Sequence, residues 1–133
     1  MKNILILVEK VGVDEIVDAK LIKLAREYCD DNIVSFYSRE FVLNQAGEYL
    51  RAKGVNIYIQ SVTLMSSIPN EQDVIVAFDV WGVKNSGSFQ AGKKIRVSEE
   101  SSLKSIIGEI NKKEIKPSVK PVGKNKSKPA SKK

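Results

Sequence analysis

Residues 3–8 read NILILV, and every side chain from Ile4 to Val8 is apolar. Such runs, without polar alternation, are typical of strands buried on both faces, as in parallel sheets. A turn containing Gly12 follows, and apolar residues then recur at helical spacing across residues 14–29, with Asp14 well suited to cap the helix. The start of the chain therefore predicts a buried strand followed by an amphipathic helix.

The same alternation of strand and helix continues along the chain. IVSFY at residues 33–37 and VNIYIQSV at 55–62 predict two more strands, with a helix capped by Ser38 between them. Short connections and right-handed crossovers make such a β-α-β-α-β unit half of a doubly wound sheet. DVIVAFDV at residues 73–80 predicts a fourth strand in a central position.

The last part of the domain is less regular. KIRV at residues 94–97 predicts a fifth strand, but only about nine residues separate it from the fourth, where a parallel crossover needs a dozen or more. We therefore expect an antiparallel strand reached through a hairpin-like loop over residues 84–92. Ser98 is expected to cap a last helix. The fold class predicted is a Rossmann-like three-layer α/β domain, with a mostly parallel sheet of four to five strands and three helices.

The charge of the chain divides sharply between two segments. Residues 112–133 hold nine lysines and one acid, Glu114, for a charge of +8, while residues 1–111 hold 13 basic and 15 acidic side chains, for −2; together they make the net +6. The basic segment has three of the four prolines and little apolar mass, so burial cannot offset its ordering entropy. We predict an α/β domain at 1–111 and a disordered lysine-rich tail at 112–133.

Several classes of function are excluded by composition. The chain has no histidine, which removes Ser-His-Asp triads, Cys-His pairs and histidine-ligated metals, and its single cysteine, Cys29, cannot form a disulfide within the chain. We expect no cofactor and no bound metal. One cysteine suits a reducing compartment, and no apolar run has the length of a membrane-spanning helix, so we expect a cytoplasmic protein with no membrane partner.

Two acids follow apolar strands at their predicted carboxyl ends, the rim where open α/β sheets bind ligands. They are Glu9, after ILILV, and Asp79, after VIVAF. The pair resembles the Toprim domain of topoisomerases and primases, which has a glutamate after its first strand and a D-x-D motif later. That resemblance implies a Mg²⁺ site. The second acid of the motif is Trp81 in this sequence, which leaves the set of carboxylates incomplete.

Residues 79–88, DVWGVKNSGS, are similar to acid, glycine and Ser-Gly elements of the nucleoside deoxyribosyltransferases. On this reading Ser86, Gly87 and Ser88 present backbone N–H groups to a phosphate. The alternative is a plain flexible loop. Trp81 and Phe89 lie on either side of residues 86–88, and they either stack on bases or cover the edge of the sheet. The turn after the first strand has no glycine-rich phosphate motif.

The tail carries the strongest functional signal. Its lysines are spaced by small residues and prolines, a pattern that contacts phosphate backbones without reading sequence, and the nucleic-acid-binding residues predicted are Lys116, Lys120, Lys124, Lys126, Lys128, Lys132 and Lys133. An anionic membrane, an acidic partner and a purely solubilising role are the competing readings. We predict a non-enzymatic accessory protein that binds a protein partner, or assembles as a homo-oligomer, through its body. The alternative is a small nucleotide-binding enzyme or sensor using Glu9, Asp79 and residues 86–88.

Overall fold

The computed structural model describes residues 1–97 and 102–112 and confirms the α/β fold class. All strands of the main sheet run parallel, in the order β5-β3-β1-β6-β7. The sheet is Rossmann-like, because successive strands are added to one side of β1 before the chain crosses to the other side. Its strands are β1 (Asn3–Leu7), β3 (Ile33–Ser38), β5 (Asn56–Ile59), β6 (Glu71–Ala77) and β7 (Gln90–Arg96).

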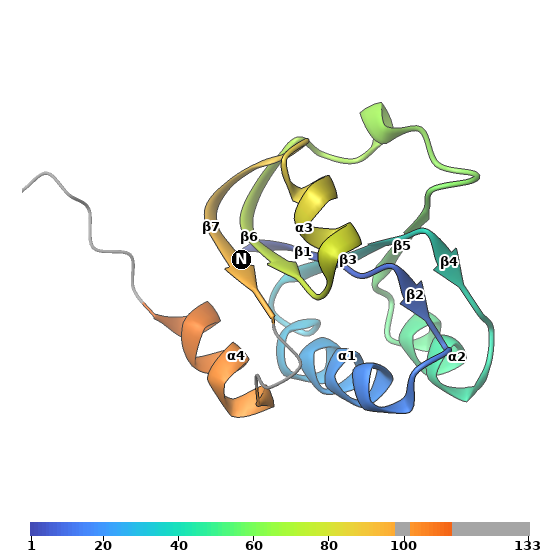
Figure 1. The fold of residues 1–133 in the computed structure, drawn as a ribbon. Coiled ribbons are helices and arrows are strands. Elements are labelled where there is room, and N and C mark those ends of the chain that lie inside the picture. The colour runs from blue at the N-terminus through green and yellow to red at the C-terminus, as the bar shows by residue number, and fades with distance from the viewer. Residues whose placement is uncertain (98–101, 113–133) are drawn as a thin grey trace, which may run out of the picture.

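Helices cover both faces of this sheet, which gives three layers (Figure 1). α1 (Glu15–Tyr28), α2 (Gln45–Ala52) and α4 (Leu103–Asn111) lie on one side, and α3 (Val80–Ser86) lies on the other. A short 3-10 turn, η1 (Met65–Ser67), interrupts the long connection from β5 to β6. The described residues therefore contain four α-helices rather than the three predicted, and the additional one is α3.

The position of β1 between two hydrophobic cores explains why its sequence is apolar without interruption. Ile4, Ile6 and Val8 belong to the larger core, which also holds the buried faces of α1, α2 and α4. Leu5 and Leu7 point to the opposite face and join a smaller core. Because successive side chains of a strand point to opposite faces, a strand between two apolar layers must be apolar at every position.

The direction predicted for the fifth strand is wrong. β7 runs parallel to β6, with Glu71 opposite Gln90 and Ala77 opposite Arg96. β6 ends earlier and β7 begins earlier than predicted, so the connection is twelve residues long, at 78–89. That length accommodates α3, and a short helix carries the chain back across the sheet, as parallel pairing requires.

A small two-stranded ribbon extends the sheet beyond β1 and β3. β2 (Lys10–Val11) pairs in parallel with β4 (Glu40–Phe41). The chain after Ser38 therefore continues as strand, and the prediction that Ser38 caps the second helix is wrong. Asn44 is the cap of α2, and its side-chain oxygen accepts a hydrogen bond from the backbone of Gly47 at 3.0 Å.

Two predictions fall on residues outside the described ranges. Ser98, expected to cap the last helix, is one of them; α4 begins after Ser102, whose hydroxyl accepts from the backbone of Ser105. The tail lysines at 113–133 also lie outside the description, and the predicted tail remains a prediction. Among the residues that are described, no helix has the length and apolarity needed to cross a membrane.

Candidate functional site at the carboxyl edge of the sheet

The strand order reverses at β1, which has β3 on one side and β6 on the other. In open α/β sheets, ligands bind at the carboxyl ends of the strands that flank such a reversal. Glu9 and Asp79 follow β1 and β6 at this edge. The two acids predicted from the sequence are therefore brought together, as expected from their places after neighbouring parallel strands.

Asp79 uses both carboxylate oxygens inside the protein. Oδ1 accepts a hydrogen bond from the backbone N–H of Gly82 at 2.7 Å and so caps α3. Oδ2 accepts from the backbone N–H of Glu9 at 2.9 Å. The side chain thus joins the start of α3 to the end of β1, across the point where a ligand would enter.

Glu9 is also engaged, on its other side. Its Oε2 accepts from Arg39 Nε at 2.9 Å, an ion pair in which both side chains are about two-fifths exposed. Its carbonyl oxygen accepts from the backbone N–H groups of Arg39 and Glu40, both at 3.0 Å. These bonds start the ribbon and hold the ends of β1 and β3 together.

The Ser86–Ser88 segment does not join these acids. α3 runs back across the sheet from Asp79, so its last residues approach the start of β7 near the amino edge. Ser88 lines an open hollow of about 570 Å³ there, together with Phe89 and residues 65–70. The five residues of the predicted ligand site therefore lie near two opposite edges of the sheet.

The aromatic residues near α3 pack on the sheet. The ring centroids of Trp81 and Tyr37 are 5.3 Å apart, and those of Phe89 and Tyr37 are 6.5 Å apart with an edge-on geometry. Phe89 and Tyr37 are buried. Burial raises the pKa of the Tyr37 phenol, and a hydrogen bond with Gln60 partly opposes that effect. Trp81 stands where the Toprim pattern has its second acid, and its ring contacts the small core.

The turn after the ribbon depends on Gly12. Its φ of +89° lies in the left-handed region, and an added Cβ would lie 2.7 Å from the carbonyl oxygen of Val42. Asn44 donates its side-chain amide to the carbonyl of Gly12 at 2.9 Å. The edge that binds phosphate in many doubly wound proteins is built here from contacts between two loops.

Asp18, on α1, is a buried acid that contacts this turn and is absent from the site residues predicted from the sequence. It is 7% exposed and accepts a hydrogen bond from the backbone N–H of Gly12 at 3.0 Å. Burial raises the pKa of its carboxyl, and the charges of Asp14 and Glu15 add to that effect, while the Gly12 bond opposes it. Its spacing within the apolar face of α1 was the available signal, since Leu21 and Ala25 lie on the same face.

We expect Asp18→Asn to raise the stability of the protein at neutral pH. When the pKa of a carboxyl is raised on folding, the free energy of unfolding falls as pH rises from the unfolded pKa through the folded pKa. Asparagine does not ionise, so the variant avoids this fall. Its side-chain oxygen can still accept the hydrogen bond from Gly12. Urea unfolding at neutral pH and near pH 4 measures the effect. The advantage of the variant should shrink at the lower pH, and an advantage that does not change with pH would contradict this account.

The turn and the ribbon also carry an exposed apolar surface. Val13, Ile16, Val42 and Leu43, called the ribbon patch below, are between 40% and 72% exposed. The loops that follow the two strands of the ribbon lie side by side, because Asn44 donates its amide to the carbonyl of Gly12 and Val42 donates its N–H to the carbonyl of Val11, both at 2.9 Å. Exposed apolar groups that gather in one place are typical of protein interaction surfaces.

The described residues contain no group of three or more acids, cysteines or histidines placed to hold a metal ion. Glu9 and Asp79 provide two carboxylates, each already hydrogen-bonded within the protein. A scan against protein-family models, a search of curated proteins and a search of solved structures each found no match.

Proposed function

We propose that this chain is a non-enzymatic accessory protein of the cytoplasm, whose body binds a protein partner or another copy of itself and whose tail associates with nucleic acid. One observation carries the first part of the proposal. Asp79, the acid at the strand rim, accepts backbone hydrogen bonds at both carboxylate oxygens, from Glu9 and Gly82, so its carboxylate is already engaged within the protein.

The surface chemistry supports a protein partner for the body. The folded part has a charge of only −2, so long-range attraction to polyanions must come from the tail, at +8. The ribbon patch lies at the edge that other doubly wound proteins use for small ligands, and it offers aliphatic side chains instead of phosphate-binding groups.

The nucleic-acid half of the proposal is tested with the full chain and with a variant in which the seven tail lysines named above become glutamine. We expect the full chain to bind a labelled duplex with an affinity that falls steeply with salt, because each phosphate contact releases counterions. The variant should lose about a thousandfold in affinity at low salt, measured by fluorescence anisotropy. Equal binding by both proteins would remove the tail from the proposal.

The partner half is tested by sedimentation of the full chain beside Leu43→Ser. Self-association that the substitution abolishes supports assembly through the ribbon patch. A wild-type chain that stays monomeric directs the search to a different protein.

The second candidate, a nucleotide-binding enzyme or sensor, rests on the meeting of Glu9 and Asp79 at the strand rim. A thermal-shift screen with nucleotides, with and without Mg²⁺, tests it. A ligand that raises the melting temperature would favour it, because a ligand that binds only the folded state stabilises that state.

A further inference from the structure

One open edge of the sheet carries basic side chains on the face where α3 lies. Among the described strands, β7 pairs with β6 alone, and Lys94 and Arg96 are exposed two residues apart along it. The Nζ of Lys94 donates to the carbonyl of Ser86 at 3.0 Å, which places its ammonium beside the end of α3. Lys84 is exposed on that helix, two residues before Ser86. Lys84, Lys94 and Arg96 are called the basic strip below.

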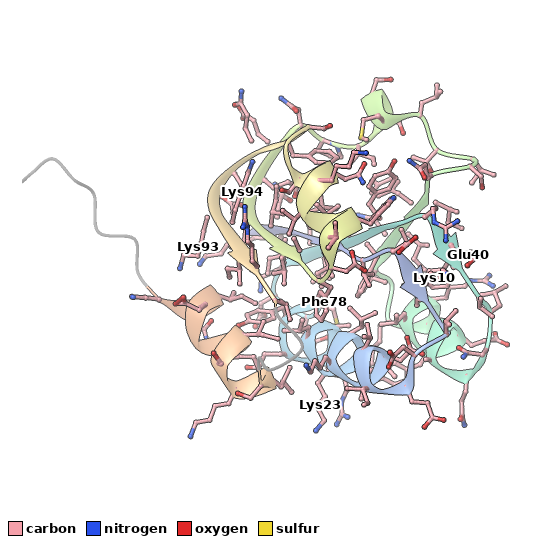
Figure 2. All side chains as sticks on the ribbon, in the orientation of Figure 1. Lys10, Lys23, Glu40, Phe78, Lys93 and Lys94 are labelled. Atoms are coloured by element: carbon pink, nitrogen blue, oxygen red, sulfur yellow. The ribbon has the colours of Figure 1, made fainter. Side chains whose placement is uncertain are left out.

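No carboxylate among the described residues neutralises the basic strip. Two ion pairs of the described residues join Lys10 to Glu40 and Arg39 to Glu9 at the ribbon. Figure 2 shows Lys10 and Glu40 on the side of the molecule away from Lys93 and Lys94. The basic strip therefore brings three exposed cations without a described acidic partner to one edge of a body whose net charge is −2.

The backbone of β7 adds donors along the same edge. The N–H of Val97 bonds to the carbonyl of Ala77, so Val97 and Ile95 turn their peptide groups toward β6. Alternate residues of a strand turn their peptide groups to opposite sides. The N–H groups of Lys94 and Arg96 therefore face the open edge, where they can donate to an anion together with the side chains.

The end of α4 is tied to this same strand. Lys93, on the opposite face of β7 from Lys94, donates its Nζ to the carbonyls of Glu109 at 2.7 Å and of Lys112. Figure 2 shows Lys93 and Lys94 on β7, on the side of the molecule where α4 lies. Lys112, the first residue of the lysine-rich sequence, therefore lies beside β7, on the face opposite the basic strip.

We propose that the basic strip and the β7 edge contact the phosphate backbone of a nucleic acid. The inference rests on the nucleic-acid association proposed above, and it adds the surface of the folded domain, along the open edge of β7, that the nucleic acid would contact. Trp81 and Phe89 pack against Tyr37, which leaves charge and backbone donors to make the contact. Binding of this kind recognises phosphates and is independent of base sequence.

The test compares two full-length variants that remove the same charge. Lys84→Gln, Lys94→Gln and Arg96→Gln together neutralise the basic strip. The control variant combines Lys23→Gln and Arg26→Gln on α1 with Lys53→Gln directly after α2, and so removes two lysines and one arginine from the other side of the sheet. Lys23 is labelled in Figure 2. Fluorescence anisotropy with a labelled duplex and a labelled single strand, across a salt series, gives the affinity and its salt slope.

We expect the basic-strip variant to lower the salt slope by about two to three and to weaken binding at low salt by about tenfold or more, because up to three phosphate contacts are lost. The control variant should change the affinity by less than about twofold, since it alters only the long-range field. Lys84→Gln alone removes one exposed charge of α3 and should lower the slope by about one; it covers the case in which the triple variant folds poorly.

The strip, control and tail variants together distinguish a failure of this inference from a failure of the proposed function. Equal effects of the two triple variants would overturn the basic strip while leaving the tail in place. Loss of binding in the basic-strip variant, with no loss in the tail variant, would support the strip and remove the tail. A full chain that binds neither nucleic acid would overturn both. A basic-strip variant that loses only its binding to vesicles of anionic lipid would overturn the choice of nucleic acid.

Discussion

Asp79→Ala is expected to lower the free energy of unfolding by about 2–4 kcal/mol. The substitution removes the cap of α3, which costs about 1 kcal/mol at a typical helix, and leaves the N–H of Glu9 without its partner, which costs about 1–3 kcal/mol at a shielded site. Both lost bonds are short, at 2.7 and 2.9 Å. Urea unfolding followed by circular dichroism measures the change.

Two further variants separate these contributions. Asp79→Asn keeps one acceptor oxygen and should fall between alanine and the wild type. Asp14 caps α1 through hydrogen bonds to Ile16 and Val17 of the same helix only, so Asp14→Ala should cost about 1 kcal/mol. If Asp79→Ala costs no more than Asp14→Ala, the bond to Glu9 contributes little, and the Asp79 carboxylate is free to meet a ligand at the strand rim.

Gly82→Ala is expected to destabilise the protein by about 2–3 kcal/mol, because α3 approaches β1 too closely for a side chain. An added Cβ would lie 2.6 Å from the carbonyl oxygen of Leu7 and 3.3 Å from Oδ1 of Asp79. Leu7 belongs to the central strand, so its carbonyl cannot move aside and α3 must move instead. Thermal and urea unfolding of the variant give the size of the effect.

Gly108 provides a matched control inside another helix. An added Cβ at this position of α4 meets no atom within 4 Å, and alanine is the better helix former, so Gly108→Ala should stabilise the protein by up to about 1 kcal/mol. The two glycine substitutions are therefore expected to have opposite signs. Stabilisation by Gly82→Ala would show that α3 does not pack against β1 as described.

The early strands and the first helix could be predicted because their patterns are local. An apolar run marks β1, and α1 runs from Glu15 to Tyr28 after the cap expected at Asp14. The second helix was misplaced at its start, because Ser38 and Asn44 are both good caps and only the pairing of β4 with β2 decides between them. A two-residue strand is too short to leave a periodic signal.

The helix α3 was missed for a related reason. Its seven residues contain Gly82, Asn85 and Ser86, and such residues are typical of turns. The helix is stabilised from outside, by the Asp79 cap and by the packing of Trp81 on Tyr37. A loop in place of α3 leaves too few residues between the fourth and fifth predicted strands for a parallel crossover, which is why the sequence favours a hairpin.

The sequence by itself determined the buried parallel core and the division of charge between body and tail. Both follow from composition and from spacing over a few residues, which do not depend on distant parts of the chain. Only the tertiary structure decided the direction of β7, the separation of residues 86–88 from Glu9, and the role of Asp79. The Asp79 carboxylate meets the N–H of a residue seventy positions away, and its availability depends on that long-range bond. The local sequence around a carboxylate at a strand end is the same whether the carboxylate binds a ligand or bonds to the backbone of its own chain. Only its hydrogen-bond partners in the folded protein distinguish the two cases.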